Sequence, residues 1–185
     1  MFENTAQALA EPGSVGVIPT DTVYGLAARA ADKTAVERLY LLKHRENKPG
    51  TVIAASIDQL EGLGLKRRYL TAISQFWPGS VSVIVPCGPD LEYLHQGKLS
   101  LAVRIPDDFV LRELLEQTGP LLTSSANAPS QPTATTVAEA RAYFADSVDF
   151  YEDGGDRSGR LPSTVLRIVD DAIEIVRQGA VNIEL

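Results

Sequence analysis

The stretch VGVIPTDTVYGL, residues 15–26, decides the fold that we expect for this chain. Its first four residues, Val15–Ile18, form an apolar run that predicts a buried strand ending at Pro19. Polar side chains follow at once in Thr20-Asp21-Thr22. Such residues often bond to nearby backbone, so the pattern is typical of a turn. The end of a strand in an α/β sheet is also the usual place of a ligand site, so this junction is a candidate.

Outward from this stretch, short β-rich runs alternate with helical ones, which predicts α/β layers. Helices are predicted at Asp32–Arg45, Arg67–Trp77, Asp107–Gln117 and Val137–Phe144, and strands at Thr51–Ala55, Ser80–Val85, Ser100–Ile105, Leu121–Thr123 and Val148–Tyr151. Two further runs, Thr164–Val169 and Ala172–Arg177, flank Asp170-Asp171 and predict a hairpin. A hairpin requires an antiparallel pair. We therefore expect one domain over residues 1–185, with a twisted, open, mixed sheet flanked by helices.

Composition and charge exclude several classes of protein. No apolar run reaches the ~18 residues of a membrane span, and the N-terminus lacks the pattern of a secretory signal. The single cysteine, Cys87, excludes an internal disulfide and any multi-cysteine metal site, and it suits a cytoplasmic protein. Seventeen basic residues against 24 acidic ones give a net charge of −7. A site for a polyanion must therefore be a local basic island.

The strongest candidate for such an island is KHRENKP at residues 43–49. One interpretation is helix capping, because cations near the last carbonyls of a helix are stabilised by its dipole. The other is an anion clamp, with Arg45 as a bidentate fork and Lys43 and Lys48 as point charges. Lys43 lies seven residues after Val36, on the apolar stripe of the predicted helix. That position favours the clamp, since a capping lysine would point to solvent.

Two more polar junctions follow predicted strands or loops. Thr123-Ser124-Ser125-Ala126-Asn127 opens a polar loop, and its side chains either satisfy that loop or bind a ligand. Pro162-Ser163-Thr164-Val165 ends the glycine-rich segment Asp153–Pro162, with Arg177 at the end of the next strand. This segment is either a lid over a pocket or a long surface excursion. No phosphate-binding loop, dinucleotide fingerprint, zinc-protease motif or nucleophile elbow is present.

Together these motifs resemble the YrdC-type threonylcarbamoyl-AMP synthases along most of the chain. The resemblance rests on seven ordered segments: PTDTVYGL at 19–26, K-x-R-x-x-K-P at 43–49, WPG at 77–79, SLAVRIP at 100–106, TSSAN at 123–127, PSTV at 162–165 and R-x-G at 177–179. It implies a sheet with a concave, positively charged face, in a short form without an extra C-terminal domain. It also implies synthesis of threonylcarbamoyl-adenylate and pyrophosphate from ATP, L-threonine and bicarbonate or CO2. The product would serve the N6-threonylcarbamoyl modification of adenosine 37 in tRNA.

The resemblance also implies roles for particular residues. The catalytic set is Lys43, Arg45, Ser125 and Asn127. ATP is expected at Lys43, Arg45, Lys48, Asn127, Thr135 and Arg177, and L-threonine at Thr20, Thr22, Tyr24, Arg104, Ser125 and Ser163. No protein metal site is expected, and Mg²⁺ would be held mainly by the ATP phosphates. The expected partners are the threonylcarbamoyl-transferase proteins, with tRNA bound weakly or indirectly and no membrane contact.

The sequence departs from the family pattern at three places and leaves two alternatives. Glu46 and Gly50 stand where many relatives have Pro and Leu, and Thr133-Ala134-Thr135 replaces a Ser-Pro-Thr, which makes the role of Thr135 less direct. The alternatives are an RNA-binding module without chemistry and a nucleotide-binding regulator. The presence of Ser125 and Asn127 separates the chain from a non-synthase branch that lacks them.

Overall fold

The computed structural model describes residues 2–44, 48–169 and 172–184. Within these residues, nine strands form one sheet in the order β7-β1-β2-β6-β3-β5-β4-β8-β9. The strands are β1 (Gly16–Pro19), β2 (Tyr24–Arg29), β3 (Thr51–Ile53), β4 (Val81–Pro86), β5 (Ser100–Arg104), β6 (Leu121–Ser125), β7 (Phe150–Tyr151), β8 (Thr164–Val169) and β9 (Ala172–Arg177). The pairs β1–β7, β3–β5 and β4–β8 are parallel and the others antiparallel. The predicted mixed sheet and the closing hairpin β8–β9 are confirmed.

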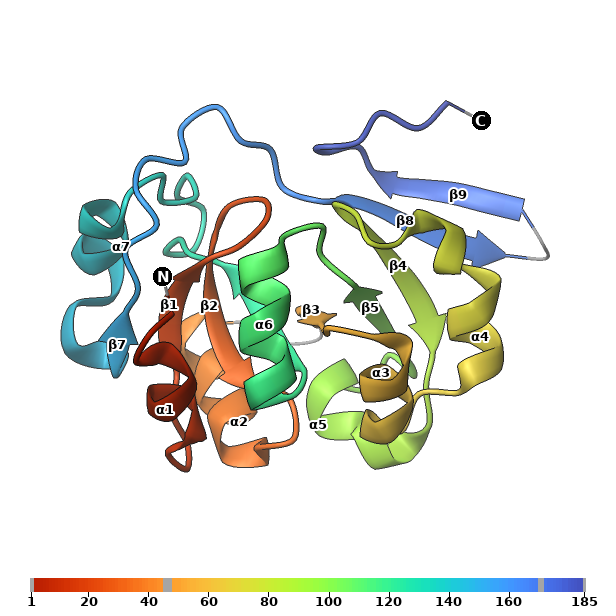
Figure 1. Cartoon of the computed structure of the whole chain (residues 1–185), viewed down its shortest axis with the longest axis horizontal. Coiled ribbons are helices and arrows are strands. Elements are labelled where there is room, and N and C mark those ends of the chain that lie inside the picture. Colours follow the sequence, from red (N-terminus) through yellow and green to blue (C-terminus); the bar gives the residue numbers. More distant parts are fainter. Residues whose placement is uncertain (1, 45–47, 170–171, 185) are drawn as a thin grey trace.

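Helices cover both faces of the sheet (Figure 1). They are α1 (Thr5–Ala10), α2 (Lys33–Leu42), α3 (Ile57–Leu63), α4 (Arg67–Ala72), α5 (Glu92–His95), α6 (Phe109–Thr118) and α7 (Val137–Phe144), with short 3-10 turns at Ser74–Phe76, Pro89–Leu91 and Ala145–Ser147. Alternate residues of β1 pack into different apolar clusters: Val17 joins the one that includes α2, and Ile18 joins the one that includes α1 and α6. Because both faces are covered, β1 is apolar without interruption, as a strand buried on both sides should be.

The sequence prediction missed the helices α1, α3 and α5 and the strand β2. Strand β2 pairs with β1 on one side and β6 on the other. The sequence of β2, YGLAAR, contains glycine and alanine, which rarely favour strands. Pairing on both sides and burial outweigh that weak propensity.

Other predicted boundaries need small corrections. The helix expected at Asp32–Arg45 is α2, which ends at Leu42; Asp32 caps it by accepting from the Ala35 amide, and Lys43 follows as C-cap. Arg45 and Glu46 lie outside the described residues. The helix expected at Arg67–Trp77 is α4 followed by a 3-10 turn, and the strand expected at Leu121–Thr123 extends to Ser125.

The segment between β7 and β8 runs across the ends of the strands, from one side of the sheet to the other (Figure 1). It contains the glycine-rich residues 153–162 and has no regular secondary structure. It therefore lies over the place where the polar junctions of β1, β5 and β6 meet.

Candidate active site

A cavity of about 230 Å³ opens where these strand ends meet. Six of the predicted site residues line it: Thr20, Thr22, Arg104, Ser125, Ser163 and Arg177. Apolar side chains, among them Val23, Ile84 and Val165, complete the walls. Drug-sized pockets have volumes of roughly 300–1,000 Å³, so this smaller cavity suits a small polar molecule.

The two threonines after β1 satisfy both interpretations of their motif. The Thr20 hydroxyl donates to the Val23 carbonyl at 2.7 Å, accepts from the Thr22 amide, and lies 3.1 Å from the Thr22 hydroxyl. The turn is therefore held by its own side chains. Both residues are buried and both line the cavity, so the turn also presents hydroxyl groups to a ligand.

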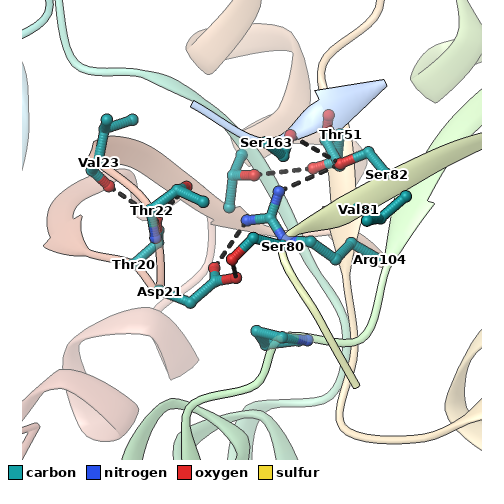
Figure 2. Close-up of polar contacts among 12 residues, drawn as sticks. Thr20, Asp21, Thr22, Val23, Thr51, Ser80, Val81, Ser82, Arg104 and Ser163 are labelled. Atoms are coloured by element: carbon teal, nitrogen blue, oxygen red, sulfur yellow. Dashed lines mark hydrogen bonds and ion pairs between the residues drawn. The ribbon is translucent and has the colours of Figure 1, made fainter. Parts of the chain in front are cut away.

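Arg104, the last residue of β5, is the central charge of the cavity wall (Figure 2). Its side chain is only 4% exposed, and its Nη2 donates to Asp21 Oδ1 at 2.9 Å. Its Nη1 donates to Ser82 Oγ at 3.1 Å, and Ser82 Oγ lies 2.9 Å from Ser163 Oγ. The guanidinium is thus buried and held in place by the side chains of Asp21 and Ser82, and Ser163 in turn holds Ser82.

Ser163 is held from its other side by Arg177. The Nε and Nη2 atoms of Arg177 donate to the Ser163 carbonyl at 3.2 and 2.7 Å. Gly179 explains the spacing of the R-x-G motif, because a Cβ at this residue would lie 2.2 Å from the Pro162 carbonyl oxygen. Glycine is therefore required for the end of β9 to approach the PSTV segment this closely.

Lys43, Ser125 and Asn127 come together, as the resemblance implied. The Lys43 ammonium donates to the carbonyls of Ser125 and Asn127 and to Asn127 Oδ1, at 2.7–2.8 Å. Ser125 Oγ donates to the same Asn127 Oδ1 at 2.6 Å. Lys43 is buried, which confirms that a lysine on the apolar stripe points inward. In this arrangement its three N–H donors shape the Ser125–Asn127 loop.

Tyr24, which was expected to contact L-threonine, has a different contact in the structure. It is fully buried and is not among the residues that line the cavity. Its hydroxyl donates to the Gly155 carbonyl and accepts from the Gly154 amide, each at 2.8 Å. Burial raises the pKa of this hydroxyl. Tyr24 thus anchors the glycine-rich segment, and its effect on a ligand in the cavity would be indirect.

The glycine-rich segment is also held by arginines that the sequence analysis did not single out. Arg157 Nη1 donates to the Thr20 carbonyl at 3.0 Å, and its amide donates to the Thr135 carbonyl at 2.7 Å. Arg160 Nη1 donates to the Asp21 carbonyl at 3.2 Å. Burial lowers the pKa of Arg157. The segment therefore contacts both the Thr20 turn and the neighbourhood of Thr135.

Two of the residues expected to contact ATP, Lys48 and Thr135, lie nearer the surface. Thr135 donates through its amide and hydroxyl to Glu139 Oε2, at 2.7 and 3.1 Å, and these bonds lower the pKa of Glu139. Lys48 is exposed and lines a groove of about 640 Å³ with Lys98 and Arg167. This groove shares Pro49 and Gly50 with the cavity, so the two are neighbours.

The described residues contain no group of three or more His, Cys, Asp or Glu side chains that could hold a metal ion. No helix within them has the length and apolarity needed to cross a membrane.

Asp21, which pairs with Arg104, is a further candidate functional residue to which the sequence analysis assigned no role. Its position between two threonines that line the cavity was the available signal.

Comparison with known proteins places this fold and site in a family. A model of the Sua5, YciO and YrdC proteins, described as "Telomere recombination", matches residues 8–179. The threonylcarbamoyl-AMP synthase of Pseudomonas aeruginosa is 35% identical over 161 residues, covering 85% of this chain and 87% of its own. That of Bacillus subtilis is 33% identical over 185 residues, covering 97% of this chain and 54% of its own.

A solved structure agrees with these sequence relatives. The crystal structure of P. abyssi Sua5 complexed with L-threonine has a TM-score of 0.83 and 29% identity, over 95% of this chain and 53% of that one. The chain thus spans about half the length of the Bacillus and P. abyssi proteins. It is an α/β protein of the Sua5/YciO/YrdC class and belongs to the family of threonylcarbamoyl-AMP synthases, which are nucleotidyltransferases.

Proposed function

We propose that the cavity binds L-threonine, that ATP binds beside it, and that the chain makes threonylcarbamoyl-AMP and pyrophosphate. The observation that carries this proposal is the buried Arg104 in a small cavity that is otherwise lined by several hydroxyl side chains and by Arg177. A guanidinium matches a planar carboxylate, and hydroxyls suit the ammonium and hydroxyl groups of an amino acid. Thr20, Thr22, Ser125 and Ser163 supply those hydroxyls.

The chemistry requires two anions to be held together. The L-threonine amine captures CO2 and loses a proton, which gives a carbamate. A carbamate oxygen then attacks the α-phosphorus of ATP, the bond from that phosphorus to the bridging oxygen breaks, and pyrophosphate leaves. The chain would contribute positioning and positive charge instead of a covalent nucleophile.

The ATP side is proposed along the Ser125–Asn127 loop and the neighbouring groove. Lys43 and Asn127 would set the position of the α-phosphate, and Arg45 and Lys48 would stabilise charge on the departing pyrophosphate. Arg177 and Thr135 are proposed to contact the nucleotide; Arg177 also lines the cavity, which supports a position for it between the two substrates.

The lining of the groove beside Lys48 agrees with a Mg²⁺ ion that is brought by ATP and is not held by protein carboxylates. The groove's described lining contains Lys48, Lys98 and Arg167 but no carboxylate. Mg²⁺ would therefore be held by phosphates and water, and it would neutralise charge on the leaving group.

The decisive experiment mixes purified protein with ATP, L-threonine, bicarbonate and Mg²⁺ and measures pyrophosphate and the adenylate. We expect pyrophosphate only when L-threonine is present, and far less from Arg45→Ala. Pyrophosphate at the same low rate in both proteins would contradict the proposal. ATP binding that ignores L-threonine would favour a nucleotide-binding regulator, and salt-dependent tRNA binding without turnover would favour an RNA-binding module.

The negative net charge of the chain limits its direct binding of tRNA. With −7 overall and its predicted site cations gathered around one cleft, the chain is poorly suited to bind tRNA by itself. We propose that the adenylate passes to a threonylcarbamoyl-transferase that holds the tRNA. Direct transfer to tRNA without such a partner would contradict this.

A further inference from the structure

We propose that Asp21 is a positioning residue for L-threonine, which acts through Arg104 and does not itself contact the substrate. This inference rests on the proposed function, and it names a residue that contributes to the selection of L-threonine. Asp21 is 3% exposed and is not among the cavity-lining residues, whereas Arg104 lines the cavity. Its ion pair with Arg104 is therefore the contact that connects the Asp21 carboxylate to the cavity wall.

The energetic reason is the burial of Arg104. A guanidinium that is 4% exposed would pay a large desolvation cost without an anionic partner. Asp21 supplies that partner at 2.9 Å. Without it, Arg104 would move towards water or towards another acceptor, and the cavity would lose its fixed donor.

Three hydrogen bonds hold Asp21, so the orientation of its ion pair with Arg104 is defined (Figure 2). Its Oδ2 accepts from Ser80 Oγ at 3.1 Å, and its Oδ1 accepts from Arg104. Its main-chain carbonyl accepts from Arg160 of the glycine-rich segment. The carboxylate is thus fixed by Ser80, which precedes β4, and by Arg104 of β5, while Arg160 holds the main chain of Asp21.

The geometry also leaves part of the guanidinium available. Arg104 has five N–H donors. Nη2 donates to Asp21 and Nη1 to Ser82, while Nε has no partner in the described structure. The single contact with Asp21 therefore holds the group without occupying all of its donors. A second carboxylate, that of L-threonine, can then be recognised by the remaining ones after a small adjustment.

Two opposite effects of removing the Asp21 charge can be separated. If Asp21 mainly weakened the positive field, Asp21→Asn would bind L-threonine more tightly. If it mainly orients Arg104, the same variant binds more weakly, because the donor geometry is lost. The contacts at Oδ1, Oδ2 and the carbonyl favour orientation.

The test measures L-threonine binding by calorimetry and steady-state kinetics on the full chain. We expect Asp21→Asn to raise the Kd and KM for L-threonine about tenfold or more, as for a lost charged hydrogen bond, with the KM for ATP within about twofold. Asp90→Asn, an exposed carboxylate remote from the cavity, is the matched control and should change neither. Asp21→Glu keeps the charge but displaces it, and should restore part of the affinity.

A double-mutant cycle tests the route through Arg104. In an Arg104→Lys background, Asp21→Asn should change the L-threonine Kd by less than about twofold. A full tenfold effect in that background, or unchanged or tighter binding by the single variant, overturns the inference. Failure of the unmodified chain to bind L-threonine would instead overturn the proposed function.

A milder variant covers the case in which Asp21→Asn does not fold, as judged by circular dichroism. Ser80→Ala removes only the hydrogen bond to Asp21 Oδ2 and keeps the ion pair. We expect it to raise the L-threonine Kd about threefold. An unchanged Kd in this folded variant overturns the inference.

Discussion

The two ends of the candidate site differ in how their polar groups are held. At the end formed by Thr20, Arg104 and Ser163, the side chains are buried and fixed by other side chains. At the end marked by Lys48, the side chain is exposed, and the groove beside it has a larger volume than the cavity. The enclosed end suits selection of one small amino acid. The open end suits a large, hydrated nucleotide that brings its own cation.

The largest expected effect comes from Lys43, which lies between the two ends. Lys43→Met removes an ammonium that donates to three oxygens of the Ser125–Asn127 loop. We expect kcat/KM to fall about 100- to 1,000-fold, as when a preorganised donor is removed from an active site. The measurement is L-threonine-dependent pyrophosphate release, with circular dichroism to show that the fold persists.

Lys33→Met is the matched control, because Lys33 is exposed at the other end of the same helix. It should retain full activity. A folded Lys43→Met variant with full activity would show that the charge at position 43 is needed neither for L-threonine nor for ATP.

The next effect concerns the enclosed end and its connection to the glycine-rich segment. Tyr24→Phe leaves the Gly154 amide and the Gly155 carbonyl without their side-chain partner. The variant loses two part-buried hydrogen bonds, and such a bond contributes about 0.5–1.5 kcal/mol, so we expect the free energy of unfolding to fall by about 1–3 kcal/mol. The affinity for L-threonine should fall several-fold, because the same segment holds the Thr20 and Asp21 carbonyls.

Denaturant unfolding and calorimetry measure these two effects. Tyr151→Phe is the control: its hydroxyl donates to the Ala145 carbonyl in a more exposed setting, away from the cavity. A Tyr24→Phe variant that loses affinity for ATP but keeps that for L-threonine would break the division into two ends.

A smaller effect is expected at the open end. Lys48→Ala removes one exposed cation, so we expect the KM for ATP to rise about three- to tenfold and the L-threonine Kd to stay unchanged. Because exposed charges are screened, the difference should shrink as salt is raised. The kinetics are compared with those of Lys66→Ala, an exposed lysine elsewhere on the surface. Equal loss of affinity for both substrates would contradict separate ends.

The smallest effect is a pH dependence at Thr135. Hydrogen bonds from Thr135 lower the pKa of Glu139, so the stabilisation from these bonds is present at neutral pH and is lost as the pH falls through the lowered value. In thermal melts, Glu139→Gln should be less stable than the unmodified chain at pH 7, and the difference should vanish on acidification. A difference that grows at low pH would contradict the assignment.

Much of the fold and of the site follows from local patterns. The start of a helix at Asp32, the inward position of Lys43 and the hairpin after Pro162 depend on spacing within a few residues, and the structure confirms all three. Strand β2 was not predicted because its stability comes from pairing with β1 and β6, which lie on both sides of it only in the folded sheet.

The supporting residues of the site were harder to foresee. Arg157 is one arginine among Gly, Asp and Ser residues, and its contact with Thr20 spans 137 positions. No local pattern marks such a residue. Asp21 lay within a recognised motif, but its role depends on Arg104, which arrives from a strand 83 residues further along the chain.

The attachment of the glycine-rich segment has a consequence for how the chain can vary in length. Surface connections usually tolerate insertions. Here one phenolic oxygen contacts two consecutive glycines, and a Cβ at Gly154 would lie 2.4 Å from Pro19. Three residues later, the segment is joined to the Thr20 carbonyl. An added residue between Gly154 and Arg157 would shift one of these attachments out of reach, so we expect the stretch from Gly154 to Arg157 to keep its length.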